Sequence, residues 1–153
     1  MIRLAGKGSG WSVKPGQVDA IDFTANQNIK INGISMFGTT RITSKSLNGL
    51  ILLKETSSQA VVAIGIFQYT ASGGTDYYDQ MFSSPGSITA GKKYTITVEY
   101  FTTATIYEAR DGLASASASC NGVTVNFAFS DSSDDNNGSK VARGQIPRIL
   151  LGC

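Results

Sequence analysis

Tyr94-Thr-Ile-Thr-Val-Glu-Tyr100 decides the fold, because its large apolar side chains alternate with Thr or Glu. A period of two places the large side chains on one face of a strand and the polar ones on the other. Residues 123–129 repeat this alternation, and the segments 21–23 and 29–31 show it in shorter form. We therefore predict strands that pack one face against a core. The aromatic residues in phase with this pattern are predicted core: Phe23, Tyr94, Tyr100, Phe127 and Phe129.

Two other segments are apolar at nearly every position, namely Leu50–Leu53 and Ala60–Phe67. Continuous apolar runs of this length are typical of strands that are buried on both faces. We therefore expect both segments to be covered on both sides.

Turn signals separate these strands. Asn-Gly, which favours type I′ hairpin turns, occurs at residues 48–49, 121–122 and 137–138. Asn32-Gly33 interrupts an apolar stretch and instead predicts a bulge. Further loops are expected at three Gly-containing segments: Ser72-Gly73-Gly74, Ser84-Pro85-Gly86 and Ala90-Gly91-Lys92. About ten short strands at this spacing predict an all-β sandwich or barrel.

Length and composition favour one folded domain over residues 1–153, which we expect to be a piece of a much longer chain. The sequence has 153 residues and a net charge of +2, with scattered basic residues apart from Lys92-Lys93. Nucleic-acid binders usually show a basic stripe, so nucleic acid is not an expected partner. No apolar run approaches the roughly 18 residues that a membrane span needs, so no membrane insertion is expected. We expect the isolated domain to be monomeric.

The two cysteines, Cys120 and Cys153, are fewer than a disulfide framework usually contains. We therefore predict reduced thiols and a cytoplasmic location.

Known catalytic constellations are missing. The chain has no histidine, which removes Ser-His-Asp and Cys-His catalysis and the commonest metal ligand. Gly6-Lys-Gly8-Ser-Gly10 lacks the P-loop spacing and is expected to be a flexible lead-in. Glu99 and Glu108 could serve a glycosidase, but nothing in the sequence places them together. We expect no enzymatic activity, no cofactor and no metal.

The acidic segment Asp131–Gly138 has two interpretations. It resembles a calcium loop, but its sixth residue is Asn136 and its twelfth is Ala142, so the Gly and bidentate Glu of an EF-hand are missing. A solvated hairpin loop is the favoured interpretation.

Recognition residues are expected in loops at one end of the domain, because loops on a rigid scaffold commonly carry binding groups. Tyr and Arg are enriched at interaction hot spots. The predicted partner-binding residues comprise two tyrosines near the glycine-rich turn, a Tyr-Arg pair in a presumed loop, and polar residues of the acidic hairpin: Tyr77, Tyr78, Tyr107, Arg110, Asp134, Asp135 and Asn137.

The order of several motifs resembles the PHR domain, which is named for the PAM and Highwire proteins and their nematode relative. The opening carries Trp11, then Asp19-Ala-Ile-Asp-Phe23, then Gly33-Ile-Ser-Met-Phe-Gly38. Lys93-Tyr-Thr95 and Val125-Asn-Phe-Ala-Phe129 follow. The closing signature is Asn137-Gly-Ser139 with Gly144-Gln-Ile-Pro147.

This resemblance implies an antiparallel β-sandwich of ten or eleven strands and a non-catalytic module that recruits proteins for ubiquitination. Two departures, Tyr107-Glu108 in place of Tyr-Gly and the lead-in Gly10–Gly16, favour a giant neuronal RING-type E3 ubiquitin ligase as parent over a BTB-containing adaptor. Gly33, Gly38, Gly138 and Pro147 are expected to be structural. A carbohydrate- or small-ligand-binding sandwich is the alternative function.

Overall fold

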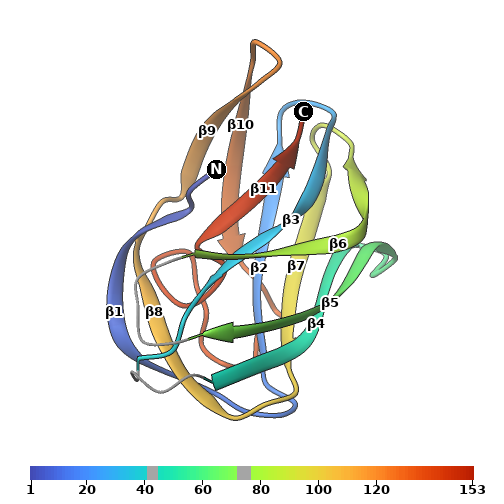
Figure 1. Cartoon of the computed structure of the whole chain (residues 1–153). Coiled ribbons are helices and arrows are strands. Elements are labelled where there is room, and N and C mark those ends of the chain that lie inside the picture. The colour runs from blue at the N-terminus through green and yellow to red at the C-terminus, as the bar shows by residue number, and fades with distance from the viewer. Residues whose placement is uncertain (41–44, 72–76) are drawn as a thin grey trace.

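The computed structural model describes residues 1–40, 45–71 and 77–153, and within these ranges it contains eleven strands and no helix. All strand pairs are antiparallel, which confirms the predicted all-β sandwich (Figure 1). The strands are β1 (Leu4–Val13), β2 (Val18–Ala25), β3 (Ile29–Phe37), β4 (Lys45–Glu55), β5 (Val61–Ala71), β6 (Tyr77–Ile88), β7 (Lys93–Tyr100), β8 (Ala104–Gly112), β9 (Ser115–Cys120), β10 (Val123–Asp131) and β11 (Arg148–Gly152). The described residues include no helix long and apolar enough to cross a bilayer.

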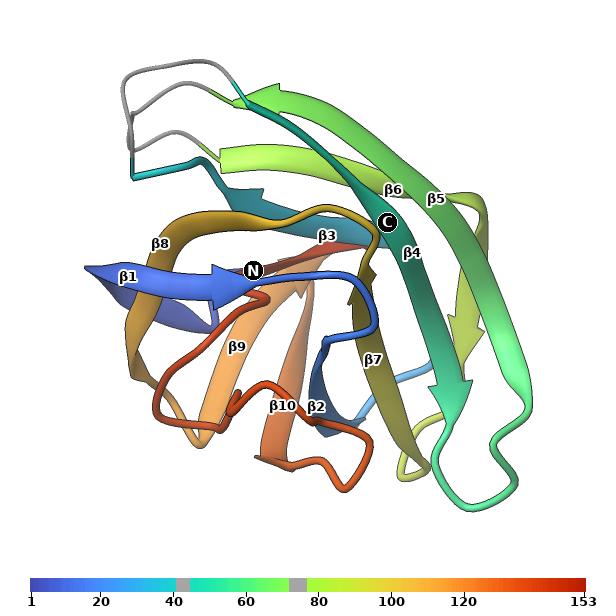
Figure 2. The ribbon, with the colours of Figure 1, turned by 90° about the horizontal axis from the view of Figure 1, so that it is seen from below.

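The larger layer is a six-stranded sheet in the order β5-β4-β7-β2-β10-β9. The second layer combines a three-stranded sheet, β11-β3-β6, with the pair β1-β8. Isolated bridges from Ile2 to Arg148 and from Thr39 to Ile106 connect these two smaller sheets. In Figure 1, β6 is drawn across β2 and β7, and Figure 2 shows the layers from below.

One hydrophobic core fills the space between the layers, as the period-two pattern predicted. The five aromatic residues expected in this core are all buried. Ile31, Ile34 and Ile149 contribute from the opposite layer. The alternating segments fold as β2, β3, β7 and β10 because this periodicity presents one continuous apolar face.

The expectation that Leu50–Leu53 and Ala60–Phe67 are covered on both sides is wrong. Buried and exposed residues alternate along β4 and β5, and Ile66 is 79% exposed. Two inward positions of β5 hold the small residues Ala63 and Gly65, while Phe67 and Tyr69 fill the core further along the strand. Space is short at Gly65, because a Cβ there would lie 2.5 Å from the Met81 carbonyl oxygen. The aliphatic residues Ile64 and Ile66 occupy outward positions.

Three loop assignments are also wrong, because strand pairing overrides local glycine content. Gly6–Gly10 belongs to β1 and pairs with β8, so it is no flexible lead-in. Tyr107 and Arg110 lie within β8. Residues 84–86 form an irregular part of β6, where the register with β3 shifts.

The Asn-Gly pairs adopt different structures in different parts of the chain. Asn121-Gly122 forms the expected β9–β10 turn, with positive φ at both residues, and Asn32 lies at a register shift, as a bulge requires. Asn48-Gly49 instead lies inside β4, which corrects the turn prediction. Residues 90–91 form the expected turn before β7. The predicted loop at residues 72–74 lies outside the described residues.

The segment 132–147 is a long connection from β10 to β11, not the predicted hairpin, since these strands belong to different sheets. It runs beside the part of β2 that β10 does not pair. There Asn136 bonds both the N–H and the C=O of Val18, and Asp135 Oδ1 accepts from the Ala20 amide at 2.9 Å. Side chains thus replace a missing strand partner along β2.

Cys120 and Cys153 form a disulfide, which corrects the prediction of reduced thiols. The two residues are far apart in sequence, but the ends of β9 and β11 bring their Cα atoms to 5.2 Å. Counting cysteines could not reveal this proximity. The bond joins the edge of the larger sheet to the edge of the three-stranded sheet, and it removes the argument for a cytoplasmic location that rested on reduced thiols.

Candidate functional site

Two predicted binding residues, Tyr77 and Tyr107, come together around Phe37. Tyr77 stacks on Phe37 with ring centroids 5.2 Å apart, and Tyr107 packs against the same small cluster. Arg148 also lies over the Tyr77 ring, with its guanidinium carbon 4.3 Å from the ring centroid. The result is a partly exposed aromatic and arginine surface over the buried Phe37. We call it the Tyr77 surface, defined by Phe37, Tyr77, Tyr107 and Arg148.

Arg148 is fixed in this position by polar contacts. Its Nε donates to Ser35 Oγ at 2.8 Å, and a terminal nitrogen donates to Asp79 Oδ1 at 2.8 Å. The hydrogen bond from Ser35, together with Arg148, lowers the pKa of the Asp79 carboxyl below its usual value of 3.8. Sequence analysis missed Arg148, because nothing in the sequence shows that β11 lies beside β3.

Tyr78 and Arg110 point elsewhere. Tyr78 stacks on Tyr69 with centroids 4.9 Å apart. Arg110 donates two hydrogen bonds of 3.1 Å to one oxygen of Glu108, a buried carboxylate. Arg143 approaches the other Glu108 oxygen at 3.7 Å. Both arginines are mostly exposed, so Glu108 anchors a pair of arginines at the surface.

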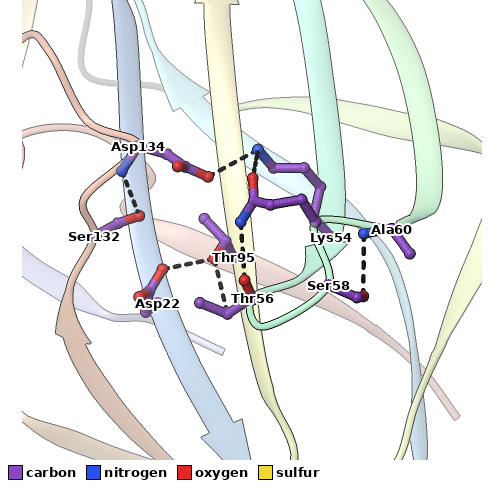
Figure 3. A network of polar contacts seen from close by, with 9 residues as sticks. Asp22, Lys54, Thr56, Ser58, Ala60, Thr95, Ser132 and Asp134 are labelled. Carbon is purple, nitrogen blue, oxygen red and sulfur yellow. Dashed lines mark hydrogen bonds and ion pairs between the residues drawn. The ribbon is translucent and has the colours of Figure 1, made fainter.

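The predicted residues of the acidic segment form a separate cluster against β2 and β4. Asp134 makes an ion pair of 2.8 Å with Lys54, which reaches across β7 to it (Figure 3). Asp135 Oδ2 accepts from the backbone amides of Asn137 and Gly138. These carboxylates hold the chain in place, which favours the loop interpretation over a calcium site. The structure therefore does not bring all seven predicted residues to one end.

The motifs at the two ends of the sequence meet at one buried carboxylate, Asp19. Its oxygens accept from Trp11 Nε1, the Tyr100 hydroxyl, Asn137 Nδ2 and the Ser139 hydroxyl at 2.7–3.2 Å. Burial raises the pKa of Asp19, and the four hydrogen bonds oppose this rise. Trp11, Asp19 and Asn137-Gly-Ser139 are thus parts of a structural network, whose members sequence analysis quoted without linking them.

Gly144 completes the closing motif. Its φ is +122°, and a Cβ there would lie 2.6 Å from the Ser139 Cα. The Ser139 hydroxyl also accepts from the Gln145 amide at 2.9 Å, so Gly144 permits the close approach that the Asp19 network needs.

The predicted structural residues occupy constrained places. A Cβ at Gly33 would collide with the carbonyl of Gln80 and lie 2.8 Å from the Met81 Cα. Gly38 is buried and its carbonyl accepts from the Tyr107 amide at 3.1 Å. Gly138 has a φ of +92°. Pro147 directly precedes β11, an edge strand, and its carbonyl accepts from the amides of Arg3 and Leu4.

A surface cavity of about 680 Å³ lies beside the disulfide. Parts of β3, β6 and the β9–β10 turn line it together with residues 152–153. Among its described lining residues only Lys30 is charged, while Ile88 and Val125 are apolar. Its volume is within the range of small-ligand sites.

Comparison with known proteins agrees with this structure. The PHR domain family model matches residues 2–152. BTB/POZ domain-containing protein 6 of Xenopus tropicalis is 26% identical over 136 residues, which cover 89% of this chain and 24% of that protein. BTB/POZ domain-containing protein 3 of Homo sapiens is 27% identical over 136 residues, covering 89% of this chain and 25% of that protein. The chain spans about a quarter of the length of these relatives, and the match over almost all of its own residues shows that it belongs to the PHR domain family.

Proposed function

We propose that this domain recruits other proteins for ubiquitination, as the non-catalytic recognition part of a larger protein. The observation that carries the proposal is the Tyr77 surface. Arg148 and Phe37 both contact the ring of Tyr77, whose side chain stays partly exposed. Rigid aromatic and arginine side chains lose little freedom on binding and supply a large contact area, which is the composition of interaction hot spots.

Two kinds of parent protein fit this role. The sequence departures at Tyr107-Glu108 and Gly10–Gly16 favour a giant neuronal RING-type ubiquitin ligase. The BTB/POZ relatives favour an adaptor. In both cases the domain binds the protein that is to be modified, and catalysis belongs to another part of the assembly.

The test begins with proximity labelling in cells, followed by calorimetry of each identified protein with the purified chain. We expect Tyr77→Ala, and the double variant Tyr107→Ala with Arg110→Ala, to weaken binding by about tenfold or more, because hot-spot truncations cost about 2 kcal/mol. Lys14→Ala, an exposed change elsewhere, serves as the control. A chain that binds no protein directly would refute the proposed function. If a partner binds all these variants with the same affinity as the unmodified chain, the Tyr77 surface is not its binding site.

The cavity beside the disulfide favours the second candidate, a small-ligand-binding sandwich. Since Lys30 is its one charged lining residue, the ligand would be anionic. A glycan array that includes sialylated and sulfated sugars tests this candidate. Binding that Lys30→Ala abolishes would support ligand binding over protein recruitment.

A further inference from the structure

On the outer face of the six-stranded sheet, the residues of one half are buried and those of the other half are accessible to solvent. Over β2 and β7 the outward residues Ala20, Thr95 and Thr97 are buried, although two of them are polar. The Lys54–Asp134 pair lies on this half, and Thr95 there contacts Asp22 and Thr56 (Figure 3). Over β4 and β5, by contrast, outward aliphatic residues remain accessible to solvent.

These accessible residues form one continuous surface. Leu50 pairs with Ile66 and Leu52 pairs with Ile64, so the four side chains lie side by side on two strands. Ile66 is 79% exposed and Ile64 is 47% exposed. We call these four residues the β4–β5 strip. Single exposed aliphatic residues are ordinary, but a contiguous group of them on one sheet face is typical of an interaction surface.

A groove of about 260 Å³ borders the strip. Leu50 and Leu52 form one side, Thr97 and Glu99 of β7 lie between the sides, and Val18 and Asp134 form the other. This volume is below the usual range for small-molecule sites and suits a side chain.

Charge in the groove is unbalanced. Lys54 and Asp134 neutralise each other at 2.8 Å. Glu99 is half-buried, and no hydrogen bond or ion pair to it is found within the described part of the chain. The groove therefore combines an aliphatic wall with one uncompensated carboxylate, which complements a basic side chain that has an apolar stem.

We propose that the β4–β5 strip and the Glu99 groove together bind an extended basic segment of a partner protein. This inference rests on the proposed function and gives that function a second contact surface. A Lys or Arg of the partner places its alkyl stem along Leu50 and Leu52 and its charged group at Glu99. Aliphatic residues of the same segment cover Ile64 and Ile66.

The extended conformation follows from the spacing of side chains on the sheet face. Side chains two residues apart in an extended chain point the same way, about 6.6 Å apart. Adjacent strands of the sheet lie about 4.8 Å apart. A segment with a basic residue followed by aliphatic residues at alternate positions can therefore reach both the groove and the strip.

The probe is a synthetic peptide of about ten residues in which Arg and two Val occupy alternate positions and Ser fills the rest. Titration into the isotopically labelled chain is followed by nuclear magnetic resonance, which detects dissociation constants up to about 1 mM. We expect shifts centred on Leu50, Leu52, Ile66, Thr97 and Glu99. Replacing Arg by Glu in the peptide, or both Val by Ser, should weaken binding by about tenfold.

Substitutions in the protein, rather than in the peptide, test the same contacts. We expect Ile66→Ser to weaken peptide binding by about tenfold and Glu99→Lys to reverse the preference between the Arg and Glu peptides. Both side chains are accessible, so the fold should persist, and an unchanged melting temperature checks this. Val123→Ser, which removes a 49%-exposed valine elsewhere, is the matched control and should bind normally.

Three results would overturn the inference. The first is no shift with the Arg peptide. The second is a dimer in sedimentation that Ile66→Ser dissociates, because the strip would then be covered by a second copy. The third is a partner identified by proximity labelling that binds Ile66→Ser and Glu99→Lys as tightly as the unmodified chain. In that third case the proposed function stands and only this surface is excluded, whereas a chain that binds no protein at all refutes the function itself.

Discussion

At the scale of single residues, buried polar groups explain the motifs that identify the family. Asp19 accepts four hydrogen bonds from residues on β1, β7 and the connection 132–147. A carboxylate in this position joins segments more than a hundred residues apart in sequence. The motif residues around it thus have a structural role.

We expect Asp19→Asn to destabilise the fold by roughly 3 kcal/mol, because the new amide group points donors at Trp11, Tyr100 and Asn137, which are themselves donors. Urea denaturation measures this change. Asp111→Asn, on the exposed end of β8, is the control and should cost less than about 0.5 kcal/mol. Equal stability of the two variants would contradict the network.

Stability should also depend on Asp79. Its pKa is lowered in the folded chain, so it binds fewer protons there than in the unfolded chain, and its contribution is present above pH 3.8. That contribution is lost as the pH falls through the lowered pKa. We expect the stability difference between the unmodified chain and Asp79→Asn to shrink between about pH 6 and about pH 2.5, measured by urea midpoints. A constant difference would show that Asp79 is not involved.

At the scale of elements, the close approach of neighbouring strands determines which residue types fit at several positions. The bulge in β3 brings Gly33 against the backbone of β6, where a Cβ has no space. In β5, Gly65 packs closely against β6, while its neighbours Ile64 and Ile66 face solvent.

Gly33→Ala should therefore lower the melting temperature by about 5 °C or more, since overpacking costs about 1–3 kcal/mol and each kcal/mol shifts a domain of this size by about 2–4 °C. Gly33→Glu should prevent folding, because it adds an unpaired buried charge. Gly91→Asn, at an open turn with a φ of +81°, is the control. A melting temperature of Gly33→Ala within about 2 °C of the unmodified chain would contradict this packing.

The disulfide between the ends of β9 and β11 closes a loop with a sequence separation of 33. In the chain-entropy model such a loop contributes about 3.7 kcal/mol. We expect the double variant Cys120→Ser with Cys153→Ser to lose about this much stability in urea, and reductant to have no further effect on it. Thiol titration of the folded chain should find no free cysteine. Two titratable thiols would show that the bond is absent.

At the scale of the whole molecule, contacts between distant parts of the sequence close the sandwich. Arg3 is fully buried and donates to the carbonyls of residues 140, 141, 145 and 146. Burial lowers its pKa to about 10. One side chain near the start of β1 thus holds the connection that carries the closing motif.

Arg3→Lys should cost roughly 2–3 kcal/mol, because an ammonium lacks the planar fork that reaches several carbonyls at once. Hydrogen exchange should become faster at the amides of residues 140–146 and stay nearly unchanged in β4. Arg143→Lys, an exposed change in the same segment, is the control. Unchanged exchange in Arg3→Lys would mean that other contacts hold the connection.

The sequence by itself determined the strand class, the inward face of the alternating strands and the family. Period-two alternation is a local property, and it persists whatever the rest of the chain does. This is why β7 and β10, and the core positions Phe23 and Phe127, were predicted correctly.

Only the tertiary structure decided which faces are covered and which residues meet. The apolar segments of β4 and β5 are accessible to solvent on one side. The polar outward residues of β7 are buried instead, because a segment about 35 residues further along the chain lies over β7. Contacts between segments that are distant in sequence also produce the Cys120–Cys153 bond, the Arg148–Tyr77 contact and the four hydrogen bonds to Asp19. Burial depends on what another part of the chain covers, and no local pattern contains that information.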